Sequence, residues 1–423
     1  MRVKILPSEI KGDFVAPPSK SMMQRVCALG LLNFGTTTIF NPGYSNDDLA
    51  ALSIIESLGA TLQKKNDSIV IISNGKVNPK PDIFCGESGL SFRLFSIVAA
   101  IGSNEFTITG TGSLLSRGMD TLIEVLNSLE VKVSSNDGRL PFKINGPIVP
   151  KNISIDGSKS SQYLTGLLIA LGSSAKETVT IDVEKLVSKP YIDLTLDMMR
   201  FFGYEITHES YQHFHIKPNQ KVEKNIEISI EGDWSSASFF IVAGAIHGNI
   251  NVVGLNMNST QADRMIVDVL NKAGVNYCTF NQQIQFSTTN DLKSFAFDAT
   301  DCPDLFPPLV VLALHCNGIS SIKGVHRLLN KESNRAFTLQ TVFSKMGAQI
   351  DIVDDEMIIQ GNAALIGAEV ESHHDHRIAM ALSIAALSAK GETSIVDANA
   401  VQKSFPEFYD KLNLLGCSLS LIK

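Results

Sequence analysis

Cations and hydroxyl groups cluster near the start of the chain, where a helix is predicted to begin. Pro18 ends a strand, Lys20, Ser21 and Arg25 follow, and the apolar helical pattern Val26 to Leu32 comes directly after. Unpaired backbone N–H groups and the positive end of the helix dipole make such a position suitable for binding an anion. An ordinary helix cap with a solvated lysine and arginine would give the same pattern, so this segment alone leaves both interpretations open.

Similar donors recur at other predicted helix starts in the first half of the chain. Gly89 precedes Arg93 in a turn that opens a helix, and the glycine-rich loop 110–116 leads to Arg117, whose guanidinium could bind a carboxylate or phosphate through two N–H groups. Donors suited to phosphate or sugar-like hydroxyls follow at two more helix starts: Ser160, Ser161, Gln162, Ser188 and Tyr191. A plain turn or a helix cap is the alternative for each segment.

The second half of the chain places carboxylates among cations. Asp304 follows Pro303 at a predicted helix start, where the helix dipole stabilises a carboxylate that could serve as a base. Further along, Lys331, Glu332 and Arg335 fall within about one helical turn. Simple capping by the aspartate and a solvated, ion-paired helix face are the alternatives.

The histidine-rich segment 373–376 suggests a metal site, but no cysteine or further histidine follows at zinc spacing. The six cysteines are spread without a Cys-x-x-Cys pair, which favours reduced, buried thiols. We therefore predict neither a metal nor a cofactor. His376 and Arg377 precede an apolar run and are expected to open a helix toward a ligand, and Lys403 stands just before a helix that begins with proline.

A repeat of about 70 residues positions these groups. Six predicted helices pass into an alternating strand at equivalent turns, at Gly59, Glu130, Gly203, Gly274, Gly347 and Gly416. The intervals are 71, 73, 71, 73 and 69 residues, which indicates one folding unit used six times. Glycine can end a helix in the left-handed conformation without a Cβ clash, and Glu130 is the one substitute. Each repeat is predicted as strand, helix, strand, helix and one or two further strands, an α+β pattern.

The recurrence of these groups decides between the alternatives. Anion-binding groups fall at helix starts in at least five of the six repeats, whereas solvated charges should be scattered. A chain of 423 residues is too long for one core, so we expect two domains of three repeats. The predicted domains are residues 13–228 and residues 1–12 together with 229–423. Their helix starts are expected to face each other across an interdomain cleft that contains the active site.

Composition excludes several classes of partner. The net charge is −7, with one tryptophan and no long basic run, which argues against nucleic acid. No apolar run reaches membrane-spanning length, and the start of the chain has no secretory core. We therefore expect a cytoplasmic protein that binds small anions and does not bind a membrane, and we expect it to be a monomer.

Together these segments resemble the 5-enolpyruvylshikimate-3-phosphate synthases, a family of enolpyruvyl transferases. The matching motifs are Pro18-Ser19-Lys20-Ser21 with Arg25, Gly89 with Arg93, Ser160-Ser161-Gln162, Ser188-Lys189-Pro190-Tyr191, Glu231-Gly232-Asp233, Pro303-Asp304, Lys331-Glu332-Ser333 with Arg335, Asp375-His376-Arg377 and Lys403-Ser404-Phe405-Pro406. The resemblance implies two domains that each contain three βαβαββ units, an inside-out α/β barrel. It also implies transfer of the enolpyruvyl group from phosphoenolpyruvate to the 5-hydroxyl of shikimate 3-phosphate through a tetrahedral intermediate. Phosphate is released, and the reaction belongs to the shikimate pathway of aromatic amino-acid biosynthesis.

The resemblance also assigns roles to residues. Shikimate 3-phosphate would be bound by Lys20, Ser21, Arg25, Ser160, Ser161, Gln162, Ser188, Tyr191, Asp304 and Lys331. Phosphoenolpyruvate would be bound by Lys20, Gly89, Arg117, Gln162, Arg335, Arg377 and Lys403. Asp304 would take the hydroxyl proton, and Glu332 would deliver and then recover the methyl proton. Lys20 and His376 would support proton movement.

Two alternatives remain. UDP-N-acetylglucosamine enolpyruvyl transferase has the same fold, but it carries Lys-Asn where this chain has Lys20-Ser21, and usually a cysteine in the loop where residues 112–116 have none. A repeat-built anion-binding protein without turnover is the second alternative, and the presence of both Asp304 and Glu332 argues against it.

The chain departs from the family pattern at a few positions. Glu87 and Leu90 replace the usual asparagine and threonine beside Gly89, which leaves the phosphoenolpyruvate contact there open. Asn334 replaces an aspartate, and only a local pairing with an arginine is expected to be lost.

Overall fold

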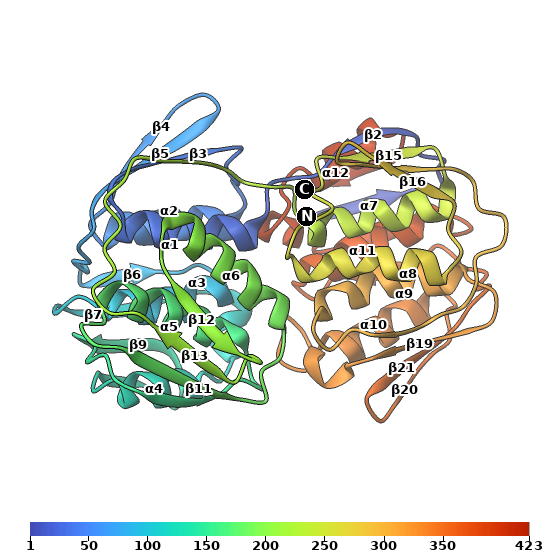
Figure 1. Cartoon of the computed structure of the whole chain (residues 1–423). Helices are drawn as coiled ribbons and strands as arrows, with labels where there is room; N and C mark the ends of the chain where they lie inside the picture. The colour runs from blue at the N-terminus through green and yellow to red at the C-terminus, as the bar shows by residue number, and fades with distance from the viewer. Residues whose placement is uncertain (423) are drawn as a thin grey trace. The chain divides into compact units, whose positions relative to one another are not determined.

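The structure is a computed structural model that describes residues 1–422, and the chain divides into two compact units. Unit 1 contains Met1–Pro17 and the chain from Gly232 onward, and unit 2 contains Pro18–Glu231 (Figure 1). These boundaries lie five and three residues later than predicted. The first boundary lies later because strand β2 (Gly12–Val15) pairs with β15 (Ile250–Val253) of unit 1. The second boundary lies later because the Glu231 carbonyl accepts a hydrogen bond from the Ser19 amide of unit 2.

Pro18–Glu231 forms three four-stranded sheets. In spatial order their strands are β14 (Ile226–Ser229), β3 (Phe34–Phe40), β5 (Ser68–Asn74) and β4 (Thr61–Lys64); β6 (Asp82–Phe84), β7 (Glu105–Thr109), β9 (Arg139–Asn145) and β8 (Lys132–Asn136); and β10 (Ile153–Asp156), β11 (Val179–Glu184), β13 (His213–Ile216) and β12 (Ile206–Glu209). In each sheet the first pair is parallel and the other pairs are antiparallel. In the sheets that begin with β6 and β10, a helix joins the parallel pair and a hairpin joins the last pair, which is the βαβαββ pattern.

Unit 1 repeats this pattern of one parallel pair followed by antiparallel pairs within its described residues. Its sheets contain β2, β15, β17 (Gln283–Phe286) and β16 (Tyr277–Phe280); β18 (Ala296–Asp298), β19 (Ile319–Lys323), β21 (Glu356–Gln360) and β20 (Ile350–Val353); and β22 (Glu369–Glu371), β23 (Thr393–Val396), β1 (Arg2–Ile5) and β24 (Leu419–Ile422). The two strands at the start of the chain complete two of these sheets, and β14 completes a sheet of unit 2. The chain therefore passes between the units twice.

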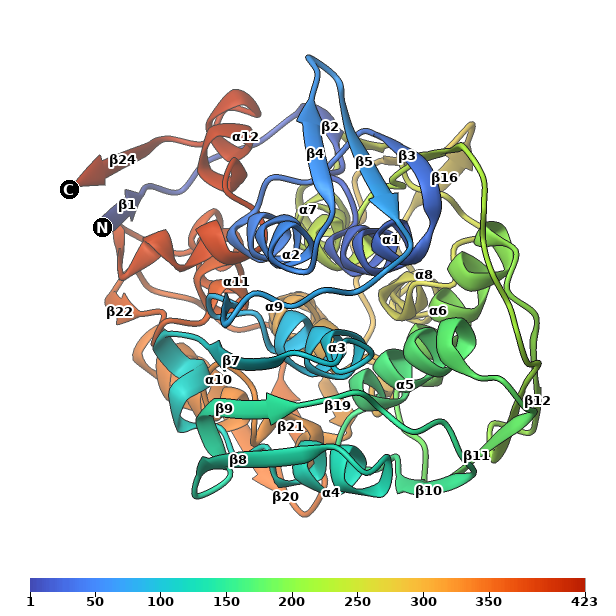
Figure 2. The same cartoon turned by 90° about the vertical axis from the view of Figure 1, so that its left-hand side faces the viewer.

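Each unit encloses three helices that are buried on all sides. In unit 2 they are α1 (Lys20–Leu32), α3 (Gly89–Ala99) and α5 (Ser161–Ser174), and in unit 1 they are α7 (Trp234–His247), α9 (Phe306–His315) and α11 (His376–Ala386). Within each unit these three helices pack against one another. A helix that is apolar around its whole circumference is stable only in a core. Figure 2 shows unit 2 with its strands on the outside and α1, α3 and α5 inside them.

The remaining helices lie around these central helices. They are α2 (Asn46–Ser57), α4 (Asp120–Ser128), α6 (Lys189–Phe202), α8 (Ile266–Lys272), α10 (Arg335–Lys345) and α12 (Phe408–Leu414), with the 3-10 helices η1 (Gly112–Ser116), η2 (Ala262–Met265), η3 (Pro303–Leu305), η4 (Val325–Leu328) and η5 (Ala398–Lys403). Within residues 1–422, no helix combines the length and hydropathy needed to span a bilayer.

All six predicted repeat turns have left-handed backbone. The five glycines have φ values from 68° to 108°, and Glu130 has φ 63°. Each turn follows a helix and precedes a strand, as the spacing predicted. A Cβ atom at positive φ crowds the backbone, so Glu130 holds a conformation that the other five repeats assign to glycine.

Replacing Glu130 by glycine should therefore stabilise the protein by about 1 kcal/mol, because the left-handed conformation costs an ordinary residue about that much. The exposed ion pair between Glu130 and Lys151 should contribute little. Urea denaturation is the measurement, with Glu130→Ala as the control that removes the ion pair and keeps the Cβ atom. Equal stability of the glycine and alanine variants would contradict the prediction.

Candidate active site

The three central helices of unit 2 begin next to one another and are capped by serine. Ser19, Ser88 and Ser160 each accept a hydrogen bond from a backbone N–H in the first turn of their helix. The helix starts are joined by side chains: the Ser91 hydroxyl donates to Gln24 Oε1 at 3.0 Å, and Arg93 Nη1 donates to Gln162 Oε1 at 2.8 Å. Because the caps carry no charge, the positive ends of three helix dipoles meet without a capping carboxylate.

Arg25 lies at this end of α1, is 1% exposed and forms no ion pair with any residue from 1 to 422. Its guanidinium donates from Nε to Thr195 Oγ1 at 2.8 Å, from Nη1 to the Ser21 carbonyl at 2.7 Å and from Nη2 to the Tyr191 carbonyl at 3.0 Å. Burial lowers the pKa of Arg25 to about 10. A buried cation with neutral partners favours an anionic ligand.

Gly89 marks the place where two more arginines meet. Arg93 Nη1 donates to the Gly89 carbonyl at 3.2 Å, and Arg117 Nη2 donates to Ser113 Oγ at 3.2 Å. A Cβ atom on Gly89 would lie 2.8 Å from Arg93 Nη1 and 3.2 Å from Arg117 Nη1. The absence of a side chain at this first residue of α3 therefore lets two guanidinium groups approach the start of the helix.

The other predicted residues of unit 2 lie at the starts of α1, α5 and α6. Lys20 Nζ is 2.8 Å from Asp47 Oδ2, so the lysine has a buried counter-ion that the sequence did not reveal. Ser161 begins α5. Ser188 precedes α6 with φ 55°, a strained conformation of the kind that often occurs at functional sites.

The residues that depart from the family pattern have specific places. Glu87 is half-buried, and its carboxylate lies against Gly112, the first residue of η1. A Cβ atom on Gly112 would lie 1.7 Å from Glu87 Oε1. Leu90 is buried in the core of unit 2. Asn334 caps α10 by accepting a hydrogen bond from the Phe337 amide at 3.4 Å.

In unit 1 the central helices begin with carboxylates. Asp233 caps α7 by accepting from the Ser236 amide at 2.7 Å, and Asp375 caps α11 by accepting from the Arg377 amide at 3.0 Å. Asp304 lies in η3, immediately before α9. A carboxylate at a helix start is stabilised as the anion, so this end of unit 1 concentrates negative charge.

Arg335 is buried and donates hydrogen bonds to three carboxylates of unit 1, which together form an acid cluster. It donates from Nη1 to Asp304 at 2.8 Å, from Nη2 to Glu332 at 2.7 Å and from Nε to Asp375 at 2.9 Å. Burial by itself would lower the pKa of Arg335, but the three carboxylates raise it above its ordinary value. Arg335 thus fixes the positions of three acids at once.

Two further cations contact Asp304, and one contacts Glu332. Lys331 Nζ and Arg377 Nη2 lie 3.2 and 3.1 Å from the Asp304 carboxylate, and Lys403 Nζ lies 3.3 Å from Glu332 Oε1. Burial of Asp304 acts to raise its pKa, but Arg377, Lys331 and Arg335 together hold the pKa well below its ordinary value. In this state Asp304 is an anion and a weak base.

Asp263 in η2 is a buried acid near this cluster that the sequence did not single out. Burial raises its pKa to about 7, and the nearby charge of Asp304 adds to the shift. A lone aspartate within an ordinary helical segment gives no signal in a single sequence.

His376 lies beside Glu332 and Asp375, and one ligand atom from each of the three could meet around a metal, since these atoms lie within 4.8 Å of one another. Both carboxylates, however, already accept hydrogen bonds from Arg335, and Glu332 also pairs with Lys403. The arginine and lysine side chains thus already pair with the carboxylates that a metal ion would need as ligands. The arrangement suits proton transfer better than metal binding.

The predicted site residues therefore form two groups. Unit 2 brings together Lys20, Ser21, Arg25, Gly89, Arg117, Ser160, Ser161, Gln162, Ser188 and Tyr191, and unit 1 brings together Asp304, Lys331, Glu332, Arg335, His376, Arg377 and Lys403. The first group contains hydroxyl and amide donors and Arg25, a buried cation with neutral partners, and the second contains the acids with their paired cations.

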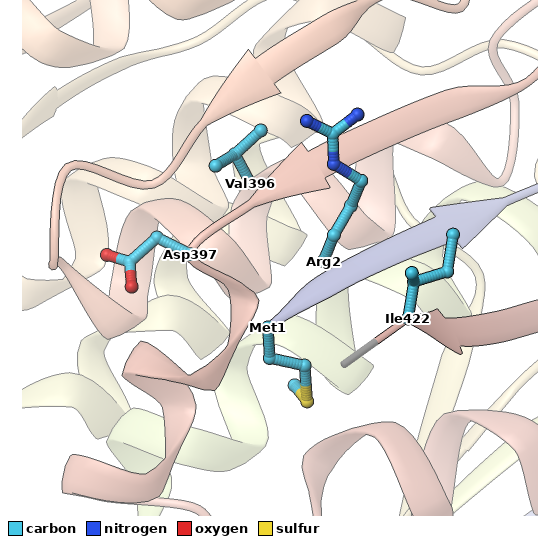
Figure 3. A pocket seen from close by; sticks show the side chains of 5 residues that line it. All are labelled: Met1, Arg2, Val396, Asp397 and Ile422. Atoms are coloured by element: carbon cyan, nitrogen blue, oxygen red, sulfur yellow. The ribbon is translucent and has the colours of Figure 1, made fainter.

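A hollow of about 340 Å³ elsewhere in unit 1 contains none of these residues (Figure 3). It is lined by Met1, Arg2, Val396, Asp397 and Ile422, at the sheet that contains β1 and β24. The labelled side chains of Asp397 and Arg2 point in different directions. The residues that line this hollow do not form a group of catalytic side chains.

Comparison with known proteins identifies this architecture. An EPSP synthase from Acinetobacter baumannii superimposes with a TM-score of 0.84 at 27% identity, covering 99% of this chain and all of the other. The enolpyruvyl transferase NikO from Streptomyces tendae gives a TM-score of 0.79 at 14% identity and shares the fold, covering 99% of this chain and 98% of its own. The fold and the clustered acids and cations define an enolpyruvyl transferase.

Sequence comparison narrows the class. The family model for EPSP synthase (3-phosphoshikimate 1-carboxyvinyltransferase) matches residues 6–412. The 3-phosphoshikimate 1-carboxyvinyltransferases of Clostridium perfringens and Clostridioides difficile are 36% and 34% identical, and each alignment covers 98% of this chain and 98% or 97% of the relative. The chain belongs to the EPSP synthase family, whose enzymes transfer the enolpyruvyl group from phosphoenolpyruvate to shikimate 3-phosphate.

Replacing Gly89 by alanine should push Arg93 and Arg117 away from the start of α3, because the new methyl group would lie within 3.2 Å of both guanidinium groups. We expect KM for phosphoenolpyruvate to rise roughly tenfold, equivalent to about 1.4 kcal/mol, with a smaller effect on KM for shikimate 3-phosphate. Steady-state kinetics with each substrate varied is the measurement.

Gly118→Ala is the matched control. A Cβ atom there would meet only Asp120, at an ordinary 3.5 Å, although the residue follows Arg117 directly. Equal effects of the two alanines on phosphoenolpyruvate would contradict the assignment of Gly89.

Proposed function

We propose that the chain carries out enolpyruvyl transfer with a division of work between its units. Unit 2 supplies the donors that bind the anionic groups of the substrates, and unit 1 supplies the acids that move protons. The observation that carries this proposal is the contrast between the helix starts. Unit 2 has serine caps and an Arg25 with neutral partners, whereas unit 1 has aspartate caps, one of which, Asp375, accepts a hydrogen bond from Arg335.

Binding of shikimate 3-phosphate is assigned to Lys20, Ser21, Arg25, Ser160, Ser161, Gln162, Ser188, Tyr191, Asp304 and Lys331. Binding of phosphoenolpyruvate is assigned to Lys20, Gly89, Arg117, Gln162, Arg335, Arg377 and Lys403. The charges of the site support this assignment, because two multiply charged anions need cationic or neutral donors, and carboxylates are tolerated only where protons move. Arg335 already donates to three acids, so its proposed part is to position them as well as to bind phosphoenolpyruvate.

Glu332 is proposed to protonate the methylene carbon of phosphoenolpyruvate. The 5-hydroxyl oxygen then bonds to the adjacent carbon while Asp304 takes the hydroxyl proton. The tetrahedral adduct loses phosphate as the methyl group returns its proton to Glu332, which leaves the enol ether, and the hydroxyl proton leaves with the inorganic phosphate. His376 beside Glu332, and Lys20, are proposed to support these proton transfers.

The cations around Asp304 connect substrate binding to this chemistry. As long as Lys331, Arg335 and Arg377 contact its carboxylate, the pKa of Asp304 stays low and it is a poor base. Substrate phosphate and carboxylate groups compete for the same cations. Their binding should raise the pKa of Asp304 toward its ordinary range and so make the base effective only when the substrates are present.

Phosphate release from the protein mixed with both substrates tests the activity. We expect release that requires both phosphoenolpyruvate and shikimate 3-phosphate and that does not occur with UDP-N-acetylglucosamine as acceptor. Binding of both substrates by folded protein without release of phosphate would favour a non-catalytic anion-binding protein. Release from phosphoenolpyruvate with UDP-N-acetylglucosamine, but not with shikimate 3-phosphate, as the acceptor would favour the sister enzyme.

The division of roles predicts different kinetic effects at two residues. Glu332→Gln should lower kcat about a hundredfold or more with small changes in either KM, because it removes a proton donor. Arg25→Ala should raise KM for shikimate 3-phosphate about tenfold to a hundredfold, because it removes a charged donor. Exposed Glu371→Gln and Arg139→Ala are the matched controls. The reverse pattern in steady-state kinetics would contradict the assignment.

The proposed setting is the cytoplasm, and the proposed state is a monomer that recognises small molecules. All six cysteines are free thiols, which suits a reducing compartment. Every residue assigned to the substrates comes from the one chain, so the proposed reaction does not call for a second copy.

A further inference from the structure

Two buried threonines accept hydrogen bonds from the Arg25 guanidinium. Thr195 on α6 accepts from Arg25 Nε at 2.8 Å and donates to the Tyr191 carbonyl at 2.8 Å. Thr165 on α5 accepts from Arg25 Nη2 at 3.5 Å, and the two threonine hydroxyls are 3.1 Å apart. Both threonines are 0% exposed. Three helices of unit 2 thus fix one guanidinium through a connected set of hydrogen bonds.

These partners are unusual for a buried arginine, since buried charges are normally paired. Arg335 in unit 1 follows the usual pattern, with three carboxylates around it. Threonine hydroxyls accept hydrogen bonds without supplying negative charge, so they can orient Arg25 and leave its full positive charge to a ligand. A carboxylate at either position would orient the guanidinium equally well and would cancel that charge.

The donor count shows which side of Arg25 faces a ligand. A guanidinium has five N–H groups. Four of them point to Thr195, Ser21, Tyr191 and Thr165, and the contact to Thr165 is the longest. The fifth, on Nη1, has no acceptor within the described chain. Nη1 also contacts Ser21, the residue beside Lys20, so the remaining donor lies at the start of α1.

We propose that Thr165 and Thr195 are positioning residues for shikimate 3-phosphate, acting through Arg25. They hold its guanidinium at the start of α1 with neutral acceptors, so that an anionic group of this substrate is the first full counter-charge that Arg25 meets. The inference rests on the proposed role of Arg25 and adds the two residues that make this role available.

Thr195→Val tests the inference because it keeps the shape of the side chain and removes the hydroxyl. We expect KM for shikimate 3-phosphate to rise about tenfold, with kcat and KM for phosphoenolpyruvate changed less than about twofold. Thr195→Ser restores the hydroxyl and should recover most of the wild-type value. Thr165→Val should have a smaller effect in the same direction, because its contact with Arg25 is longer. Thr393→Val, a fully buried threonine at the start of β23 in unit 1, is the matched control.

The same substitution in an Arg25→Ala background separates positioning from a general effect on folding. If Thr195 acts through Arg25, adding Thr195→Val to Arg25→Ala should leave KM for shikimate 3-phosphate unchanged. Full additivity of the two effects, or a fall in the urea midpoint of Thr195→Val without a change in this KM, would overturn the inference. If Arg25→Ala itself leaves this KM unchanged, the assigned role of Arg25 is wrong and the inference falls with it. A large effect of Arg25→Ala with none of Thr195→Val would refute the inference alone.

Discussion

The convergence of three parallel, buried helix starts in each unit is the constraint on which the rest of this structure depends. A helix start exposes backbone N–H groups that have no partner within the helix, and burying three of them together requires acceptors or a ligand. The outer sheets bury the apolar surfaces of the helices and leave these ends as the polar part of each unit. A side chain placed there meets the positive ends of the helix dipoles, so its charge matters more than it would on a surface.

The two units differ in the residues that cap their central helices. Serine caps leave unit 2 with positive potential at its helix starts, and Arg25 adds a cation that has only neutral partners. Aspartates at the helix starts give unit 1 the negative charge, which Arg335 gathers into one network. One repeated fold thus provides neutral helix caps around Arg25 in unit 2 and a cluster of acids and cations in unit 1, through a change of capping residue and of the partners around one buried arginine.

The network around Arg335 also explains how several acids can coexist in a small volume. Asp304, Glu332 and Asp375 would repel one another, but each accepts a hydrogen bond from the same guanidinium. Because these contacts are charge-assisted and buried, they hold the carboxylates in fixed positions. They also keep Asp304 ionised, which links its strength as a base to whatever competes for the surrounding cations.

The sequence by itself determined the repeat and the class of fold, and it named most of the residues of the candidate site. The positive φ of Glu130 and of the five glycines follows from a period of about 70 residues, because the same short turn ends one helix of every repeat and recurs at that interval. Motifs such as Pro18-Ser19-Lys20-Ser21 are local in the chain, so one sequence is enough to recognise them. Tertiary structure alone decided the distant partners: Asp47 for Lys20, Thr195 for Arg25, and Asp304 and Asp375 for Arg335. Those pairs join segments that are 27 to 170 residues apart or depend on how helices pack, and isolated threonines and aspartates carry no periodic signal. The exact domain boundaries were also set by strand pairing, since β2 and β14 each complete a sheet with residues distant in the chain.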